Sequence, residues 1–544
     1  MNSSLLGYAF VVIGALLYTI YKRLTRISIA HVPGPESDSF LVGNLHEFFS
    51  SQAGECDFKW QAEFGDVIRV KASLGEDQLL VMDPKALHYI YHASGYDFAK
   101  PPARRELARA ISGSGVTWAE GESHKRQRRI MLPGFGLQEA RALFPVFSRY
   151  ANQMTDKWKE ILETTKGGEA TINVSQWLSR AMLDAIGEAA FDYHFNTLEN
   201  NDDPLGQAYF RLTMSTYGVP TKAAILMQGI TGRLPQWMVR LLFDYAPMKS
   251  LLHARVTAQL ATAVAQDLVR AKLEALAHGE VKKDILSLLV KSNTAANESV
   301  RLSDHELISQ MRALMFTGHE TSANMLTWIL LELACQPHIQ DRLREEIRET
   351  ERACRARGSL ELTLPDIDGM VYYQAVLKES FRMHPVGIST FRKATKDCVL
   401  PLSTPIVTTS GEVINDLPIP RGLNIIGSVI GYNRNKDVFG ADSHVFNPDR
   451  WLVPKKEDPN ATRIGVYNNL FTFSGGVRTC PGWRIAMVEM QTFLAELVSC
   501  FEFSLTDEAR TIRRESALVM IPTVEGRINE GAQLPLKVKL ARRD

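Results

Sequence analysis

The sequence has few cysteines for its length. Its 544 residues include only six, and no two of them are close enough to form a CxxC or CxxxC pair. This scarcity excludes a disulfide scaffold, a zinc knuckle and an iron–sulfur cluster held by cysteines. It also indicates that the body of the protein lies in a reducing compartment.

The sequence also has no large excess of positive or negative charge. Lysine and arginine number 62 and aspartate and glutamate 61, so the formal net charge is +1, which argues against a nucleic-acid binder. A mean hydropathy of −0.12 is too low for a polytopic membrane protein. With 45 % apolar and 23 % charged residues, the chain has the composition of a large globular protein, not of a disordered one.

Loops that bind phosphate are also absent. Neither GxGxxG nor GxxxxGK[ST] occurs between a predicted strand and a predicted helix, so any nicotinamide or flavin is expected on another protein. His88 and His92 have the i, i+4 spacing of a zinc pair but lack the glutamate of HExxH, and we predict no zinc site there. There are no internal repeats.

One long hydrophobic run stands at the N-terminus. Residues 5–21 carry no charge, and with the two preceding serines the run reaches about 19 residues, or about 28 Å as a helix, enough to cross a bilayer. Basic residues follow at once (Lys22, Arg23 and Arg26), which places the bulk of the chain on the cytoplasmic side. We therefore predict a single-pass transmembrane anchor with its basic flank over residues 1–30 and one catalytic domain over residues 31–544. A buried core helix is the alternative for the run.

The remaining pattern predicts a mostly α fold with a minor β region. Residues 65–83 alternate between apolar and polar side chains and read as a β-hairpin. Helical periodicity dominates from about 120 to 390, and residues 390–430 are strand-like. Helix returns after Cys480, and a strand-rich tail covers residues 518–541.

Cys480 lies in a segment whose residue types suit a cofactor. The spacing is Phe473-x-x-Gly476-x-Arg478-x-Cys480-x-Gly482. Cys480 is expected at the start of a helix, where the helix dipole and free N–H groups would stabilise a thiolate. The glycines would let the backbone approach a flat cofactor, Phe473 would shield the sulfur, and Arg478 would meet an anionic group such as a propionate. One soft ligand is enough when a macrocycle supplies the others. The alternative is a buried free cysteine in a glycine-rich turn.

This segment resembles the haem-binding loop of the cytochrome P450 family of haem-thiolate monooxygenases. Further motifs agree with it, so the resemblance covers nearly the whole chain. It implies the cytochrome P450 fold, haem b as the cofactor and Cys480 as the axial ligand of the iron. The chain looks most similar to microsomal fungal members, which implies the endoplasmic reticulum membrane.

Two motifs resemble the family's structural triad. Glu379-Ser-Phe-Arg382 resembles the ExxR pair, whose members face the same way on a helix. Arg450, in the segment Phe446–Trp451, matches the arginine that joins this pair. The resemblance implies that the three side chains brace the cysteine loop. Taken alone, the spacing of Glu379 and Arg382 is typical of a solvated ion pair.

Residues 317–322 resemble the oxygen-activation motif of the family's long central helix. The resemblance implies that Glu320 and Thr321 are catalytic and relay protons to bound oxygen in a dry pocket. The family usually has Ala or Gly where Thr317 stands, so the oxygen groove is expected to differ slightly. The alternative is a helix-interior threonine that bonds back to a carbonyl.

Basic side chains are expected around the cofactor. His124 and Arg128 resemble the aromatic residue and arginine that hold a haem propionate, with His in place of the commoner Trp, and Arg392 matches another propionate-binding arginine. Lys125, Arg126 and Arg129 would present a basic face to an acidic reductase. A merely solvated face is the alternative.

The predicted activity is oxidation of a lipophilic small molecule with O₂ and electrons from an NADPH-dependent cytochrome P450 reductase. We expect the pocket to be mostly apolar and lined by a loop over residues 100–120, in which Ser112–Gly115 would be flexible, by helices within 205–255, and by Leu314–Thr317 and Val386–Phe391. A terpenoid or other secondary metabolite is the favoured substrate. The alternatives are an isomerase or dehydratase that needs neither O₂ nor reductase, and a non-catalytic haem-binding membrane protein.

Overall fold

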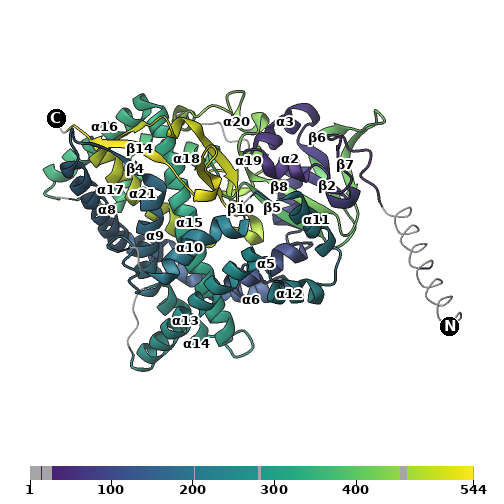
Figure 1. The fold of residues 1–544 in the computed structure, drawn as a ribbon, viewed down its shortest axis with the longest axis horizontal. Coiled ribbons are helices and arrows are strands. Elements are labelled where there is room, and N and C mark those ends of the chain that lie inside the picture. The colour runs from purple at the N-terminus through teal and green to yellow at the C-terminus, as the bar shows by residue number, and fades with distance from the viewer. Residues whose placement is uncertain are drawn as a thin grey trace.

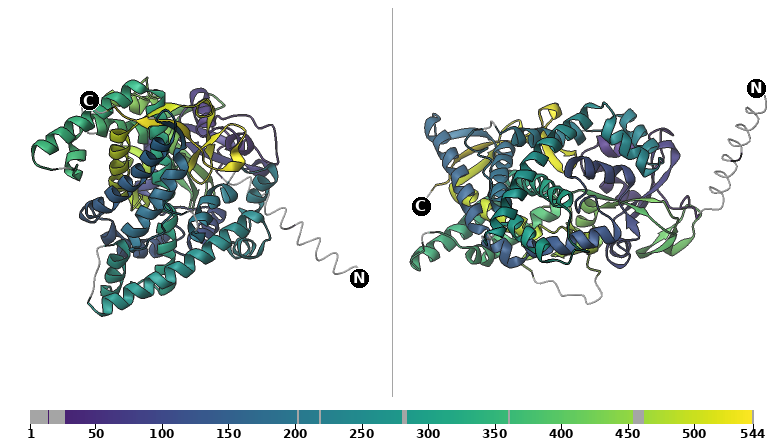
Figure 2. Two further views of the ribbon diagram at one scale, coloured as in Figure 1. Left: turned by 60° about the vertical axis from the view of Figure 1, so that its left-hand side comes forward. Right: turned by 90° about the horizontal axis from the view of Figure 1, so that it is seen from below.

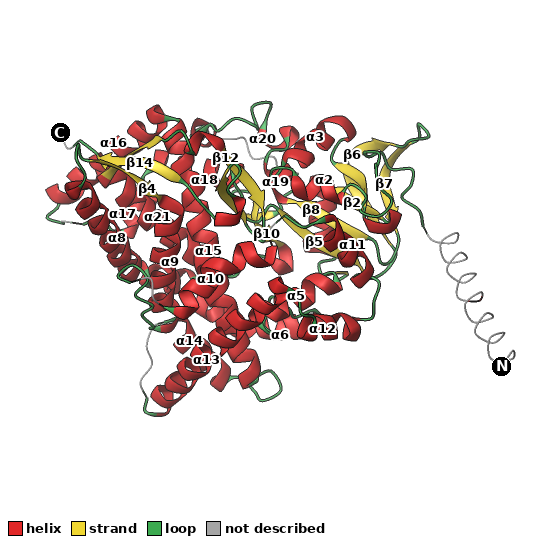
Figure 3. Ribbon diagram, in the orientation of Figure 1, coloured by secondary structure: helices red, strands yellow, loops and turns green. Residues whose placement is uncertain are grey.

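The computed structural model describes residues 27–200, 203–217, 219–279, 284–359, 361–453 and 462–542, together with Gly14. Helices form most of this part of the chain and strands a smaller part, which confirms the predicted mostly α fold with a minor β region (Figure 3). The predicted anchor over residues 1–30 falls outside the described residues except for Gly14 and residues 27–30. Of the helices that are described, none combines the length and the apolar character needed to cross a bilayer.

The helices of the described chain are numbered as in Figure 1. They are α2 (Leu45–Ser50), α3 (Glu55–Phe64), α4 (Pro84–His88), α5 (Pro102–Ser112), α6 (Gly121–Met131), α7 (Leu137–Ala142), α8 (Phe144–Thr164), α9 (Val174–Phe191), α10 (Pro204–Tyr217), α11 (Lys222–Thr231), α12 (Gln236–Tyr245), α13 (Lys249–Ala277), α14 (Ile285–Ala295), α15 (Asp304–Cys335), α16 (Pro337–Ala356), α17 (Leu364–Gly369), α18 (Val371–Met383), α19 (Val429–Asn433), α20 (Lys436–Phe439) and α21 (Trp483–Cys500).

The strands are short. They are β1 (Val67–Lys71), β2 (Asp77–Val81), β3 (Phe98–Ala99), β4 (Glu169–Asn173), β5 (Ser389–Ala394), β6 (Cys398–Val407), β7 (Val413–Ile419), β8 (Asn424–Ser428), β9 (Gly465–Tyr467), β10 (Leu470–Gly475), β11 (Phe501–Leu505), β12 (Ile512–Ser516), β13 (Met520–Val524) and β14 (Pro535–Leu540).

The long helix α15 forms the centre of the molecule. Its start is fixed by a capping box, in which the N–H of Glu306 donates to the Ser303 hydroxyl (3.2 Å) and the N–H of Ser303 donates to the Glu306 carboxylate (3.0 Å). Every side chain from Ser322 to Leu330 is buried, as expected for a helix that is surrounded on all sides. The helix ends at Cys335 because Pro337, two residues later, begins α16.

The largest sheet has the strand order β1-β2-β8-β5-β3. Antiparallel pairing of Val67 with Val81 confirms the hairpin predicted over residues 65–83. β8 runs parallel to β2 and antiparallel to β5. The strand-like character of residues 390–430 is confirmed by β5 to β8, and that of the tail by β13 and β14, of which β14 lies between β11 and β4.

The larger sheet and the helix-rich part lie on opposite sides of the molecule, although β4 and β14 lie among the helices on the left of Figure 1. In Figure 1 the β6–β7 hairpin and the strands β2 and β8 lie on the right, α8, α9, α17 and α21 lie on the left, and α15 runs between them. The two turned views in Figure 2 keep this arrangement, with the purple N-terminal helices beside the green strands. The cysteine segment after β10 therefore lies near the boundary of the two parts.

Two local predictions are wrong. Residues 100–120, expected as a loop, contain the helix α5, because the segment Ala103–Ala110 is rich in helix-forming residues and Pro102 is tolerated in the first turn. The helix stops at Gly113, which has a φ of +79°. Cys480 is not in the first turn of a helix, because α21 begins only at Trp483, with Gly482 as its N-cap residue.

Candidate active site

The cysteine lies at the end of a short ordered segment. β10 leads into a turn of 3₁₀-helix over Gly476–Arg478, and the N–H of Cys480 donates to the carbonyl of Phe473 (2.9 Å). The side chain of Cys480 is only partly covered by protein atoms. Its low-dielectric surroundings raise the pKa of the thiol, whereas the N–H of Gly482 and the charge of Arg128 lower it.

The two glycines of the segment have different roles. Gly476 has a φ of +58°, and a Cβ there would lie 1.9 Å from the carbonyl oxygen of Tyr91. The protein's own backbone therefore requires this glycine, a role that the sequence did not predict. A Cβ at Gly482 would meet only the ring of Phe135, at 3.8 Å, so the space beside Gly482 is not filled by protein.

Aromatic rings surround the start of the segment. The ring of Phe473 lies 5.4 Å from that of Phe381 and 6.4 Å from that of Trp483, measured between centroids. Tyr467 completes the cluster, at 6.3 Å from Phe473. Phe473 is thus held in an apolar cluster, and its carbonyl accepts from the N–H of Cys480.

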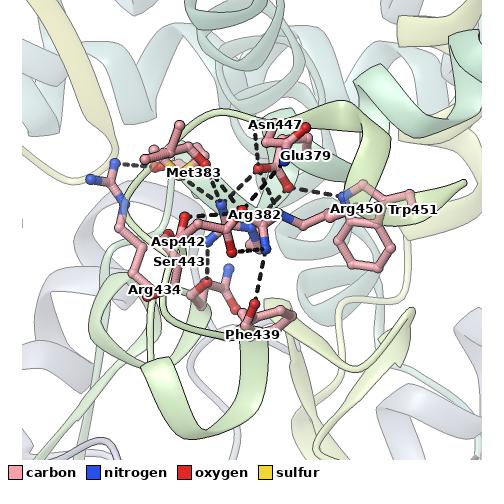
Figure 4. A network of polar contacts seen from close by, with 12 residues as sticks. Glu379, Arg382, Met383, Arg434, Phe439, Asp442, Ser443, Asn447, Arg450 and Trp451 are labelled. Atoms are coloured by element: carbon pink, nitrogen blue, oxygen red, sulfur yellow. Dashed lines mark hydrogen bonds and ion pairs between the residues drawn. The ribbon is translucent and has the colours of Figure 1, made fainter. Parts of the chain in front are cut away.

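Glu379, Arg382 and Arg450 come together, and their side chains are 0 %, 0 % and 7 % exposed (Figure 4). Arg382 donates to both carboxylate oxygens of Glu379, at 2.9 and 2.7 Å, and Arg450 donates to Oε1 at 2.9 Å. The carboxylate also accepts from the indole of Trp451 (2.9 Å) and the N–H of Asn447 (2.8 Å). Because Glu379 and Arg382 are buried, they do not form a solvated ion pair.

Asn433 connects this cluster to the cysteine segment. Its carbonyl accepts from Arg382 (3.0 Å), and its side chain accepts from the N–H of Phe471 (2.9 Å) and donates to the hydroxyl of Thr472 (2.8 Å). Phe471 and Thr472 belong to β10, and the next residue, Phe473, holds the N–H of Cys480. The bracing role is thus carried by a continuous chain of hydrogen bonds.

Basic side chains gather beside Cys480. The guanidinium of Arg128 donates to the carbonyl of Thr479 (2.6 Å). Arg478 pairs with Glu120 and lies over the ring of Tyr96, 5.2 Å from its centroid. His124 is buried and hydrogen-bonded to the hydroxyl of Tyr96 (2.9 Å). Burial and the charges of Arg478, Lys100, Arg128 and Arg392 lower the pKa of His124 to about 3.

Lys100 is the least expected member of this group. Its ammonium donates to the carbonyl of Ala119 (3.1 Å) and lies 3.7 Å from Glu120. Burial lowers its pKa to about 7, and Glu120 offsets this only partly, because Arg478, Arg392 and Arg105 repel the charge. Arg392 itself donates to the carbonyl of Phe391 (2.8 Å) and lies over the ring of Tyr91.

These basic side chains suit the edge of a cofactor that carries two negative charges. Lys100, Arg128, Arg392 and Arg478 converge on a region whose nearest carboxylate is that of Glu120, and Nε of Arg478 is buried without a hydrogen-bond partner. Burying cations without matching anions is costly, and two carboxylates would compensate them. The residues present therefore suit haem, with its two propionates here and its iron at Cys480.

Glu320 and Thr321 are both on α15, but they are not joined. The hydroxyl of Thr321 donates to the carbonyl of Thr317 (2.9 Å), which is the back-bonded arrangement left open as an alternative. The carboxylate of Glu320 accepts from Asn324 (3.0 Å) and lies 3.6 Å from His319. No hydrogen bond between Glu320 and Thr321 is present among the described residues.

The middle of α15 nevertheless has one uncovered side. Thr317 is exposed and Thr321 half-buried, although their neighbours in the sequence are almost all buried. Such exposure halfway along a central helix indicates an internal space next to these two residues. Leu314 and Val386, both half-buried, belong to the segments predicted to line it.

The predicted basic face is smaller than expected. Arg126 is half-buried and paired with Glu306 of α15, because both side chains lie where α6 meets that helix. Lys125 is exposed and pairs with Glu122 (2.6 Å), and Arg129 is exposed. Lys125 and Arg129 are therefore the two members of the predicted face that reach the solvent.

Sequence reasoning missed several members of the site. Tyr96, Lys100 and Glu120 contact Arg478 or His124 through the fold, and no local spacing marks them. Asn433 was missed for the same reason. The one available signal was Glu120 itself, an acidic residue just before the helix that carries His124 and Arg128.

The chain is similar to known proteins along nearly its whole length. It matches the family described as Cytochrome P450 over residues 33–529. It is 32 % identical to cytochrome P450 monooxygenase 212 of Postia placenta over 550 residues, which cover 98 % of each chain. It is 31 % identical to cytochrome P450 monooxygenase claQ of Ampulloclitocybe clavipes, over 97 % of each chain. It is also 29 % identical to ganoderic acid synthetase CYP5150L8 of Ganoderma lucidum, over 99 % of each.

Proposed function

The chain belongs to the cytochrome P450 family of haem-thiolate monooxygenases, and from this premise we propose that Cys480 is its axial iron ligand. The observation that carries the proposal is the partly exposed Cys480 beside a cluster of basic side chains whose nearest carboxylate is that of Glu120. Bound haem would supply the activation of O₂ for oxidation of a C–H bond.

The basic cluster would bind the propionates. Arg128, Arg392 and Arg478 would hold them, with His124 and Lys100 as further donors. Because Arg128 already holds the carbonyl of Thr479, it would fix the propionate edge and the cysteine segment relative to each other. The network of Glu379 would help to hold that segment in the position that haem requires.

Thr321 and Glu320 would handle protons on the side of the internal space. The Thr321 hydroxyl donates to a helix carbonyl, so its oxygen lone pairs remain free to accept a proton donor such as a water molecule. Glu320 is buried beside Asn324 and His319, and it would reach Thr321 only through a water or after a rotamer change. Glu320 is buried and Thr321 half-buried, so the protein would limit the access of bulk water to both groups.

The substrate of this enzyme would be lipophilic, and an NADPH-dependent cytochrome P450 reductase would supply its electrons. The half-buried apolar side chains of Leu314 and Val386 support the first point. Exposed Lys125 and Arg129 on α6 support docking of an acidic partner. A terpenoid or other secondary metabolite remains the favoured class, and a relative of this chain is named a ganoderic acid synthetase.

We also propose attachment to the endoplasmic reticulum membrane through residues 1–30, with the catalytic domain on the cytoplasmic side. Exposed apolar side chains on α12 and at the start of α13 support it, since they have the i, i+4 spacing of one helix face: Trp237 (64 % exposed), Leu241 (49 %), Tyr245 (76 %), Leu252 (44 %) and Val256 (52 %). Such a surface suits a lipid headgroup region.

The test of the proposed function is the spectrum of the reduced, CO-bound protein. The purified protein should show the Soret band of thiolate-ligated haem and oxidise NADPH with reductase in a substrate-dependent manner. Cys480→Ala should lose the band, whereas Cys335→Ala, which changes an exposed cysteine, should keep it. Thiolate-type absorption that survives Cys480→Ala would refute the assignment.

A further inference from the structure

A turn of π-helix packs against the start of the cysteine segment. It spans Tyr89–Ala93, directly after α4, and the N–H of Ser94 donates to the carbonyl of Tyr89 (2.9 Å), five residues earlier in the chain. Such turns are rare in proteins and occur frequently at functional sites. The function of this one follows from its contacts with the segment that carries Cys480.

His92 of this turn holds the strand pair that leads to the cysteine. Its Nε2 lies 2.7 Å from the carbonyl oxygen of Ile464, and because that oxygen can only accept, Nε2 is the donor. Ile464 is fully buried and immediately precedes β9, which pairs with β10. A Cβ on Gly475, the last residue of β10, would lie 2.9 Å from Nε2. The imidazole is therefore in contact with both the start of β9 and the end of β10.

Other parts of the turn region contact the next two residues of the segment. A Cβ on Gly476 would lie 1.9 Å from the carbonyl oxygen of Tyr91, and a Cβ on Gly95 would lie 2.6 Å from a methyl group of Val477. Together with the contact of His92, these contacts cover three successive residues just before the cysteine. Packing this close leaves the segment little room to move.

The turn is itself firmly held. The side chain of Tyr91 is 1 % exposed, and its ring packs edge-on against Phe471 of β10, at 4.9 Å between centroids. Its hydroxyl is hydrogen-bonded to Thr390 of β5, and the guanidinium of Arg392 lies over the ring, 5.0 Å from its centroid. Because Tyr91 is fixed in this way, the adjacent His92 has a rigid support.

We propose that the turn Tyr89–Ala93 is a second brace of the cysteine segment and that His92 is its positioning residue. The inference rests on the proposed function and adds a residue to it. The network of Glu379 holds the first half of β10 through Asn433, whereas His92 holds the end of β10 and the start of β9. His92 acts through these strands on the Cys480 thiolate and takes no part in bond breaking.

Two variants separate the hydrogen bond of His92 from the packing of its ring. His92→Phe keeps an aromatic ring but leaves the carbonyl of Ile464 without this donor, whereas the amide nitrogen of His92→Gln can take the position of Nε2. The purified, reduced and CO-bound holoenzyme is held at a urea concentration below the unfolding transition. There, His92→Phe should lose the thiolate-type Soret band about tenfold faster than the wild type, as expected for the loss of a buried hydrogen bond. His92→Gln should return the rate close to the wild-type value.

His88→Phe is the matched control. His88 is half-buried and its ring stacks on that of His92, with centroids 4.7 Å apart, but among the described residues no hydrogen bond joins it to the cysteine segment. This variant should lose the band at the wild-type rate.

Two results would overturn the proposal. One is a His92→Phe protein that has a lower melting temperature but keeps the band as long as the wild type, because His92 would then serve only general stability. The other is loss of the band in His92→Gln or His88→Phe as fast as in His92→Phe, because ring packing and not the bond to Ile464 would then be responsible. Absence of the thiolate-type band in the wild type would instead refute the proposed function.

Discussion

Replacing Glu379 with glutamine tests the cluster that holds the cysteine segment. The carboxylate accepts five hydrogen bonds, two from Arg382 and one each from Arg450, Trp451 and the N–H of Asn447. Glutamine keeps the shape of the side chain but has only one oxygen that can accept. The two N–H groups of its amide would face the N–H groups that bind the carboxylate in the wild type. The buried guanidinium of Arg382 then loses its counter-charge, whereas Arg450 keeps that of Asp442 (2.8 Å).

The expected loss is large. Breaking a buried ion pair by removing one partner costs about 3–5 kcal/mol, against a total stability of about 5–15 kcal/mol for a folded domain. Because Arg382 also holds Asn433, and Asn433 holds β10, the damage should reach Cys480. We expect Glu379→Gln to lower the free energy of unfolding in urea, followed by circular dichroism, and to replace the thiolate-type Soret band with that of haem lacking this ligand.

Glu122→Gln is the matched control. The distance between Glu122 and Lys125 (2.6 Å) is close to that between Glu379 and Arg382, but the side chains of Glu122 and Lys125 are 86 % and 48 % exposed. Exposed pairs contribute little, so this variant should unfold like the wild type. If Glu379→Gln behaves like Glu122→Gln, with an unchanged urea midpoint and an intact Soret band, the reasoning that the network braces the cysteine segment is wrong.

Three further perturbations address the other parts of the site. Because the pKa of Lys100 falls from 10.5 to about 7 in the folded chain, the folded apoprotein binds fewer protons than the unfolded chain between these values, and its stability should decrease as pH falls from 10.5 to 7. Lys100→Met should flatten this pH dependence and raise the free energy of unfolding of the apoprotein at pH 7 by roughly a few kcal/mol. The same variant should lose haem to apomyoglobin faster than the wild type. An unchanged pH profile of stability would contradict the role of Lys100. Thr321→Ala should lower the product formed per NADPH by about tenfold or more, and equal coupling in Thr321→Ala and wild type would remove Thr321 from proton delivery. Trp237→Ser with Leu241→Ser should weaken flotation of a protein lacking residues 1–30 with phosphatidylcholine vesicles, whereas flotation that does not change would place the lipid contact elsewhere.

Local sequence signals were enough for the parts of the site that are close in the chain. The spacing around Cys480 placed Phe473 and Arg478, and the i, i+3 spacing of Glu379 and Arg382 placed both on one helix face. The hairpin over 65–83 followed from alternation alone. In each case a short stretch of chain fixes the geometry.

Contacts between distant segments could not be read in this way. Lys100, Glu120 and Tyr96 surround Arg478 only because β3, α6 and β10 meet in the fold. Adjacency in sequence was also misleading for Glu320 and Thr321. Neighbouring residues of a helix point about 100° apart, so Glu320 turns to Asn324 while Thr321 faces the internal space.

The position of Asn433 ties the lifetime of the protein to the supply of its cofactor. Asn433 links the core helix α18, through Arg382, to β10, the strand that precedes Cys480, and Thr472 of β10 adds a direct bond to the carbonyl of Phe381 (2.7 Å). Unfolding of this region would therefore also dismantle the proposed haem site, so that haem binding and folding are coupled. A ligand that binds only the folded chain stabilises it by mass action, by about 4 kcal/mol at a thousand times its dissociation constant. When haem is scarce, this coupling shifts the population toward open chains that proteases can cleave, so cellular abundance would report haem availability.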